Sequence, residues 1–147
     1  MKLRSGYFLI YKGLQCKLLP STEPEIISSD KRSLELGFSQ YPNTTTYHKH
    51  INKSDISTAF EVITKAKYKG HIFQVTENKV VVDDDKITLF LNNLDFEAYD
   101  MFGFNYRNDN ANILVQVKDL ESIWEERKPL LDFIFNIDPI YYIKGSA

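Results

Sequence analysis

Residues 55–75 read DISTAFEVITKAKYKGHIFQV, and the expected fold is worked out from this stretch. Its apolar residues recur at three- and four-residue steps, which predicts an amphipathic helix with one buried face. Ser54 stands at the N-cap position, and Gly70 can take the left-handed conformation that ends a helix. We expect a strand to begin at His71. The stretch therefore predicts a helix-to-strand junction near Gly70.

A similar pattern recurs in the second half of the chain, at an offset of 64 residues. This offset aligns Asp55 with Asp119 and Phe60 with Trp124. We expect a second helix to begin at Asp119 and to end by Pro129, because proline cannot continue a helix. Spacing of this kind is typical of tandem copies of one supersecondary unit.

The strands expected before each helix come in runs and do not alternate with helices. Apolar segments on both sides of Lys12-Gly13 predict a tight hairpin. The predicted class is α+β: two tandem repeats of antiparallel strands, each followed by a helix, with the helices packed on a meandering sheet. We expect a single domain, residues 1–147, built of repeats at about 1–69 and 70–147.

The composition is typical of a globular protein with many strands. Hydrophobic residues make up 43% of the 147 residues and aromatic residues 14%, a high share that favours strands. The single cysteine, Cys16, cannot form an internal disulfide, which fits a reducing cytoplasm and a role as a small core residue. No apolar run approaches the roughly 20 residues of a membrane span. We expect a cytoplasmic protein that is not associated with membrane.

The charges are distributed unevenly along the chain. The net charge of −2 argues against direct binding of nucleic acid. Residues 1–70 carry eleven Lys and Arg against six Asp and Glu, whereas residues 71–147 carry seven against fourteen. An acidic second half would attract a basic partner. The alternative is a solvated surface that happens to be uneven.

No catalytic or metal-binding pattern is present. His48 and His50 fall on the same side of an expected strand, and His71 could join them, but no cysteine or carboxylate close in sequence completes a metal site. Residues 83–85 are three aspartates without the spacing of a calcium loop. Phosphate loops and nucleophile elbows are also missing. We therefore expect neither an enzyme nor a bound cofactor or metal.

The best candidate for a binding surface is an acidic and aromatic loop at residues 92–100. Aromatic side chains can anchor an interface, and carboxylates can pair with Arg or Lys of a partner. The predicted partner-binding residues of this loop are Asp95, Phe96, Glu97, Tyr99 and Asp100. Residues Asp83, Asp84, Asp85, Glu121 and Glu125 could extend the same acidic surface, the last two from an exposed helix face. The alternative is that Leu94 and Phe96 simply cover the core.

The chain resembles small bacterial immunity proteins, which are encoded beside the polymorphic toxins of contact-dependent growth inhibition and related systems. The residues that carry the resemblance are Tyr68-Lys69-Gly70, Ile87–Leu91, Gly103-Phe104 and Ile123–Pro129. The resemblance implies a cytoplasmic protein that binds a cognate toxin domain and covers or distorts its active site. The acidic half of the chain is compatible with a basic nuclease as that toxin.

An interaction module without a toxin partner is the alternative function. Such a protein could form a symmetric homodimer through its aromatic surface or a sheet edge. A monomer in the free state fits the immunity hypothesis better, because it leaves the acidic surface available to a partner.

Overall fold

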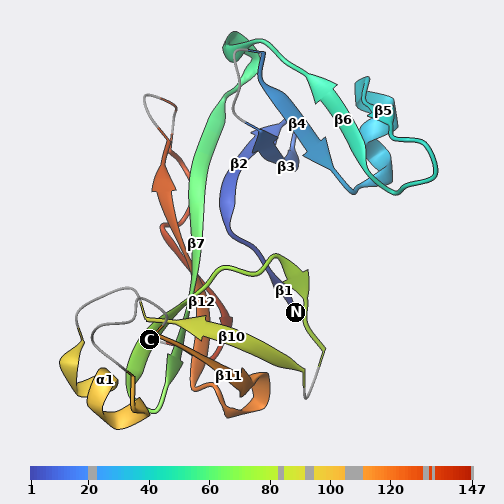
Figure 1. Ribbon diagram of the computed structural model, residues 1–147. Coiled ribbons are helices and arrows are strands. Elements are labelled where there is room, and N and C mark those ends of the chain that lie inside the picture. The colour runs from blue at the N-terminus through green and yellow to red at the C-terminus, as the bar shows by residue number, and fades with distance from the viewer. Residues whose placement is uncertain are drawn as a thin grey trace. The chain divides into compact units, whose positions relative to one another are not determined.

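The protein has a sheet-dominated α+β fold in which antiparallel strands far outnumber helices (Figure 1). The computed structural model describes residues 1–19, 23–82, 85–91, 95–104, 111–130, 133 and 135–146. In chain order the elements are β1 (Lys2–Leu3), β2 (Gly6–Tyr11), β3 (Leu14–Leu19), β4 (Glu25–Ser28), the 3₁₀ helix η1 (Lys31–Leu36), β5 (Ser39–Gln40), β6 (Tyr47–His50), η2 (Lys53–Asp55), β7 (Thr58–Tyr68), β8 (His71–Val75), β9 (Lys79–Val80), β10 (Lys86–Phe90), α1 (Phe96–Phe102), β11 (Asn112–Gln116), η3 (Val117–Asp119), β12 (Ser122–Pro129) and β13 (Ile140–Lys144). The α+β class predicted from the sequence is confirmed.

The chain forms two compact units. The major unit holds residues 1–5, 62–127 and 138–147, and the minor unit holds residues 6–61 and 128–137. Strands β7 and β12 each continue from one unit into the other. The expectation of a single domain stays a prediction.

The minor unit contains an antiparallel meander with the strand order β2, β3, β4, β6, β5. Its first hairpin confirms the predicted turn. Tyr11 pairs with Leu14 across Lys12 and Gly13, whose φ angles of 48° and 80° fit a two-residue type I′ turn. Strand β3 alternates buried and exposed residues along its length, so one face joins the core.

Cys16 belongs to that core, as the sequence predicts. The side chain is 1% exposed and packs in the hydrophobic cluster of the minor unit. Burial is the main cause that raises the pKa of the thiol to about 11, and the nearby Asp30 carboxylate adds to the effect. The thiol therefore stays protonated at neutral pH and acts as a small apolar residue.

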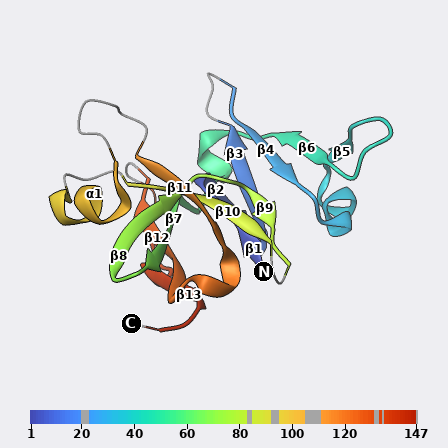
Figure 2. The same ribbon diagram turned by 60° about the horizontal axis from the view of Figure 1, so that its bottom comes forward.

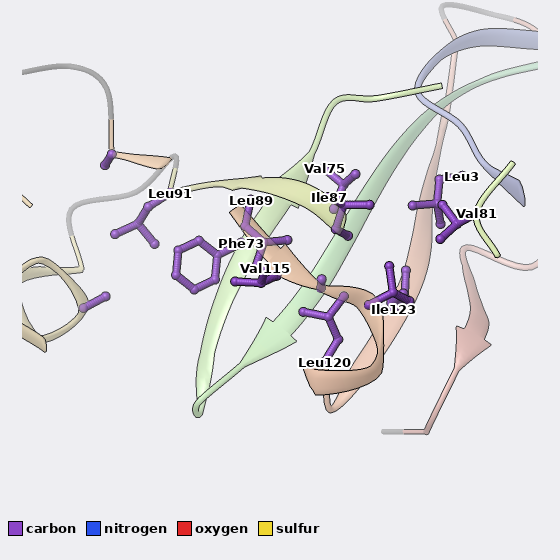
Figure 3. Close-up of a cluster of buried hydrophobic side chains, with 14 residues drawn as sticks. Leu3, Phe73, Val75, Val81, Ile87, Leu89, Leu91, Val115, Leu120 and Ile123 are labelled. Carbon is purple, nitrogen blue, oxygen red and sulfur yellow. The ribbon is translucent and has the colours of Figure 1, made fainter. Parts of the chain in front are cut away.

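The major unit contains a second antiparallel meander, in which β8 pairs with the end of β7 and β10 pairs with both β8 and β11. Strand β12 pairs with β13, and β1 with β9. Figure 3 shows side chains from several of these strands converging on one apolar cluster. Its largest fully buried members include Phe73, Leu3, Ile87, Leu89 and Ile123.

The two helices expected from residues 55–69 and 119–129 are wrong, because both segments are mainly β-strand. Strand β7 covers Thr58–Tyr68, and strand β12 covers Ser122–Pro129. From Phe60 to Ala66 every second residue of β7 is buried, which is the period of a strand. The segment is also rich in β-branched residues, whose restricted χ1 angles favour strands.

The offset of 64 residues nevertheless relates two local structures. The 3₁₀ helices η2 and η3 begin at Lys53 and Val117, and the strands that follow them begin at Thr58 and Ser122. In each case the residue after the 3₁₀ helix donates its backbone N–H to the first residue of that helix. Both segments thus begin with a 3₁₀ helix and continue as a strand, and the prediction of tandem repeats stays a prediction.

Candidate functional site

The candidate site lies around α1 in the major unit, where the sequence predicted a loop. Residues Phe96–Phe102 form a short helix, so the loop assignment is wrong for this part of residues 92–100. Asp95 caps the helix: its carboxylate Oδ1 accepts a hydrogen bond from the backbone N–H of Ala98 at 3.0 Å. Gly103 ends it in the left-handed conformation, with φ of 71°. Residues 92–94 lie outside the described part of the chain.

Two carboxylates hold the β7–β8 turn next to this helix. Asp95 Oδ2 lies 2.9 Å from Nδ1 of His71, the first residue of β8. Because an ionised carboxylate only accepts hydrogen bonds, Nδ1 is the donor. Gly70, the preceding residue, donates its backbone N–H to Glu121 Oε1 at 2.9 Å. Figures 1 and 2 both show α1 beside the end of the sheet where β7 turns into β8.

An aromatic cluster packs against α1 through Phe102, the last residue of the helix. The ring of Phe102 contacts four others: its centroid lies 5.8 Å from that of Tyr68, 5.9 Å from His71, 5.4 Å from Phe73 and 5.8 Å from Phe104. Stacked and edge-to-face pairs at these distances are favourable beyond the area they bury. The helix is short, so this cluster and its caps hold it in place.

The outer side of α1 combines apolar and acidic side chains. Phe96 is 58% exposed and Met101 is 53% exposed, and Glu97 and Asp100 are also exposed. We call these four residues the α1 surface. Ala98, in contrast, is fully buried in the core of the major unit.

Tyr99, the fifth predicted residue of the former loop, is half-buried. Its ring packs edge-on against Phe104 at 5.8 Å between centroids. Sequence reasoning missed Met101 and His71 as members of this site. An Asp at the N-cap and a Gly shortly after the apolar residues are helix signals that could have revealed Met101.

The hydrogen bonds that the Asp95 carboxylate accepts lead to a prediction about how the stability of the fold depends on pH. The pKa of its carboxyl lies below the ordinary 3.8, first because the Ala98 N–H donates to it and second because His71 does. The ionised carboxylate of Asp95 therefore stabilises the folded protein at pH values above the pKa that this group has in the unfolded chain. This stabilisation is lost as the pH falls through the lower pKa of the folded state. Asp95→Asn keeps a capping oxygen but removes the charge. We expect the difference in unfolding free energy between wild type and variant to shrink below about pH 4, as measured by urea unfolding across pH. A pH-independent difference would contradict this role.

The remaining predicted acidic residues lie at different places in the chain, and their part in one surface with α1 stays a prediction. Asp83 and Asp84 lie outside the described residues. Asp85 precedes β10, whereas α1 follows the opposite end of that strand, and its carboxylate accepts the backbone N–H of Lys86 at 2.8 Å. Glu121 is exposed beside Gly70, with Lys67 Nζ 3.9 Å from its Oε2.

The placement of Glu125 on an exposed helix face is wrong. Glu125 lies in β12 with only 3% of its surface exposed. Arg4 contacts both of its carboxylate oxygens, through Nε to Oε2 at 2.7 Å and Nη2 to Oε1 at 3.1 Å. Arg127 adds a third hydrogen bond, Nε to Oε1 at 3.1 Å. Glu125 is therefore part of a buried ion network and is not available to a partner.

The three histidines are divided between the two units. His48 Nδ1 lies 3.2 Å from Glu25 Oε1 in the minor unit, and its ring stacks on Tyr41 at 4.0 Å between centroids. His71 belongs to the major unit. Across the described ranges, no three His, Cys, Asp or Glu residues form a group that could hold a metal ion.

The charge asymmetry between the halves of the sequence does not carry over to the two units. The minor unit carries seven basic and seven acidic residues, and the major unit eleven and thirteen. The major unit gains Lys2 and Arg4 from the N-terminus, Lys65 and Lys67 from β7, and Lys69 from the β7–β8 turn. The basic residues that join the major unit thus largely balance the acidic second half of the sequence, and only local acidic surfaces remain.

No helix in the described residues is long and apolar enough to cross a membrane.

Comparison with known proteins gives a family. No curated protein matches the chain, and no solved structure matches it. A family model covers residues 3–130, which is most of both units. The chain therefore belongs to the family described as uncharacterised conserved protein UCP033725.

Proposed function

We propose that the protein is a cytoplasmic immunity protein that binds a cognate bacterial toxin domain through the α1 surface and so neutralises it. The observation that carries this proposal is the exposure of Phe96 and Met101 beside Glu97 and Asp100 on a helix fixed at both ends. The resemblance to small immunity proteins supplies the class of partner. Covering or distorting the toxin's active site would be the means of inhibition.

The exposure of Phe96 favours this role over the alternative in which the residue covers the core. A phenylalanine with 58% of its surface in water contributes little to the core of its own chain. In an interface, the same ring and the adjacent Met101 can be desolvated by a partner and become anchors. The two acidic side chains would steer a basic partner and pair with its Lys or Arg residues.

The support beneath the α1 surface favours tight binding. Phe102 packs into the aromatic cluster, and Asp95 bonds to both Ala98 and His71. A surface held in its bound conformation loses less conformational entropy on association. This is an argument for affinity and does not identify the partner.

We also propose that the chain consists of two tandem repeats. Several matched features support this. The turns Lys12-Gly13 and Lys69-Gly70 have φ angles of 48° and 80°, and 47° and 79°. Asp30 and Asp95 cap η1 and α1, which both end at a left-handed glycine. In this arrangement β7 ends the first repeat, at about residue 69, and β8 is the first strand of the second.

A homodimeric module remains the second candidate, and one observation favours it. Leu114 is 61% exposed on β11, which ends the strand order of the major unit next to β10. An exposed apolar residue on a terminal strand can pair with a second copy. Sedimentation of the purified protein distinguishes the two: a stable dimer at all concentrations supports the module, and a monomer supports immunity.

The direct test is co-expression with the toxin candidate encoded upstream of the native gene. We expect its C-terminal domain to stop bacterial growth when expressed alone, and this protein to restore growth and to co-purify with it. A harmless neighbour that does not co-purify would contradict the immunity proposal.

The binding surface is tested by charge reversal within that complex. We expect Glu97→Lys with Asp100→Lys to slow association by about tenfold or more at low salt and to flatten its salt dependence, because steering by the acidic side chains is lost. Asp95 is left unchanged because it caps α1. The matched control is Glu35→Lys with Asp138→Lys, two exposed acidic residues elsewhere. Equal effects of the two pairs would remove the α1 surface from the interface.

A further inference from the structure

A cleft of about 770 Å³ opens in the minor unit, on residues to which the sequence assigned no role. Its volume falls within the range of small-molecule sites, roughly 300–1,000 Å³. The lining residues are Tyr11, Lys12, Glu23, Pro24, Lys49, His50, Ile51, Asn52, Lys53 and Asp55. All of them belong to the minor unit.

Backbone and side-chain hydrogen bonds hold the walls of the cleft together. The N–H of Ile51 donates to the carbonyl of Pro24 at 3.0 Å, which joins the end of β6 to the segment before β4. Ser57 Oγ donates to the carbonyl of Ile10 at 3.4 Å, which joins the segment after η2 to strand β2 beside the Lys12 turn. The cleft is therefore framed by elements that are fixed to one another.

Three separate elements each contribute a lysine to this cleft. Lys12 comes from the β2–β3 turn, Lys49 from β6 and Lys53 from η2. The ammonium of Lys12 lies 5.3 Å from the ring centroid of Tyr11, and that of Lys53 lies 5.7 Å from the ring of Phe133. As far as the described residues extend, none of the three forms an ion pair.

Two carboxylates also line the cleft, and they offset part of the charge of the three lysines, which leaves one positive charge in excess. Asp55 Oδ2 accepts the backbone N–H of Asn52 at 3.3 Å, as part of the cap of η2. Glu23 also has an interaction partner of its own. The lysines therefore leave the cleft with an excess of positive charge.

We propose that this cleft binds a small organic phosphate. Lysine ammonium groups act as point charges that can pair with the several oxygens of a phosphate, and three of them line the cleft. Asn52 and His50 offer further polar groups. Tyr11, Pro24 and Ile51 provide apolar surface for the organic part of the ligand, which a bare phosphate would not fill.

Calorimetric titration of the full chain at low ionic strength tests the proposal, with adenosine monophosphate, inorganic pyrophosphate and citrate as probes. We expect the nucleotide to bind with a Kd of about 1 mM or tighter. Pyrophosphate binding as tightly as the nucleotide would overturn the organic part of the proposal, and citrate binding as tightly would overturn the phosphate class. If neither the nucleotide nor pyrophosphate binds, the proposal as a whole is overturned.

A matched pair of triple variants locates the site. The cleft variant is Lys12→Asn, Lys49→Gln and Lys53→Gln, in which asparagine tolerates the left-handed φ of 48° at position 12. The control is Lys17→Gln, Lys31→Gln and Lys128→Gln, which removes three exposed lysines of the same unit that do not line the cleft. We expect the cleft variant to weaken binding at least about tenfold and the control less than about twofold. Equal losses would show general charge attraction and overturn the site. Lys53→Gln alone, outside any turn, gives the same test if the triple variant does not fold.

Discussion

Glu125→Gln is expected to lower the free energy of unfolding by about 3–5 kcal/mol, because it removes the negative charge of the buried carboxylate that Arg4 and Arg127 share. The Glu125 side chain is 4% exposed, and those of Arg4 and Arg127 are each 13% exposed. Glutamine has nearly the same shape, so the loss reflects charge and hydrogen bonding more than packing. Both guanidinium groups would lose this carboxylate while their side chains stay largely buried. Urea unfolding followed by circular dichroism measures the difference.

The neighbouring residue supplies the control for this prediction. Glu126 also lies in β12 and pairs with Lys65, Nζ to Oε2 at 2.9 Å, but their side chains are 27% and 31% exposed. A partly solvated pair of this kind contributes up to about 1 kcal/mol. Glu126→Gln should therefore have a much smaller effect than Glu125→Gln. Equal effects would show that burial of the Glu125 network does not decide its contribution.

The network around Glu125 also shows what a linear sequence hides. Glu125 and Arg4 are 121 residues apart in the chain, and they meet because β12 and the N-terminal residues fold into the same unit. The sequence pattern placed Glu125 in a helix, facing water. Since a strand turns alternate side chains to opposite faces, the correct secondary structure was needed before its partners could be predicted.

The same dependence explains the two wrong helices. Ile56, Ala59, Phe60, Ile63 and Ala66 match a helical face, but Phe60, Val62, Thr64 and Ala66 match a strand face equally well. In the structure the second set is buried, and Ile63 and Lys65 are only half-buried between them. Periodicity alone cannot decide between such overlapping patterns, and pairing with neighbouring strands decides it here.

Features set by local chemistry were easier to predict. The Lys12-Gly13 hairpin depends on the left-handed tolerance of glycine and on apolar runs at both sides, which a sequence displays directly. The burial of Cys16 follows similarly from its place among alternating residues of β3. Phe96, Glu97 and Asp100 are exposed, and their role in binding a partner stays a prediction.

The lysine cleft could not be found from local patterns. Lys12, Lys49 and Lys53 come from a turn, a strand and a 3₁₀ helix. Strand pairing within the meander and the hydrogen bonds of Ile51 and Ser57 bring these elements together. Nothing in the spacing of these lysines resembles a phosphate-binding motif. Chemistry assembled from three elements becomes visible only when the meander of the minor unit is known.

Phe73→Ala should lower the free energy of unfolding by about 3–5 kcal/mol, through lost burial and the cavity that remains. Phe73 is 1% exposed in the core of the major unit (Figure 3) and its ring contacts that of Phe102 in α1 at 5.4 Å between centroids. Because α1 rests on this aromatic cluster, its backbone should open more often. Urea unfolding measures the first effect, and faster amide hydrogen exchange within α1 measures the second.

Ile72→Ala is the matched control, because Ile72 precedes Phe73 in β8 and points to the opposite face. Its side chain is 48% exposed, so truncation should cost at most about 1 kcal/mol, mainly in strand preference. Hydrogen exchange in α1 should then stay close to that of the wild type. A loss of stability as large as that of Phe73→Ala would mean that the outer face of β8 is covered in solution. Such a result would also move the binding surface from α1 to the sheet, since an isoleucine covered in solution implies a partner or a second copy on that face.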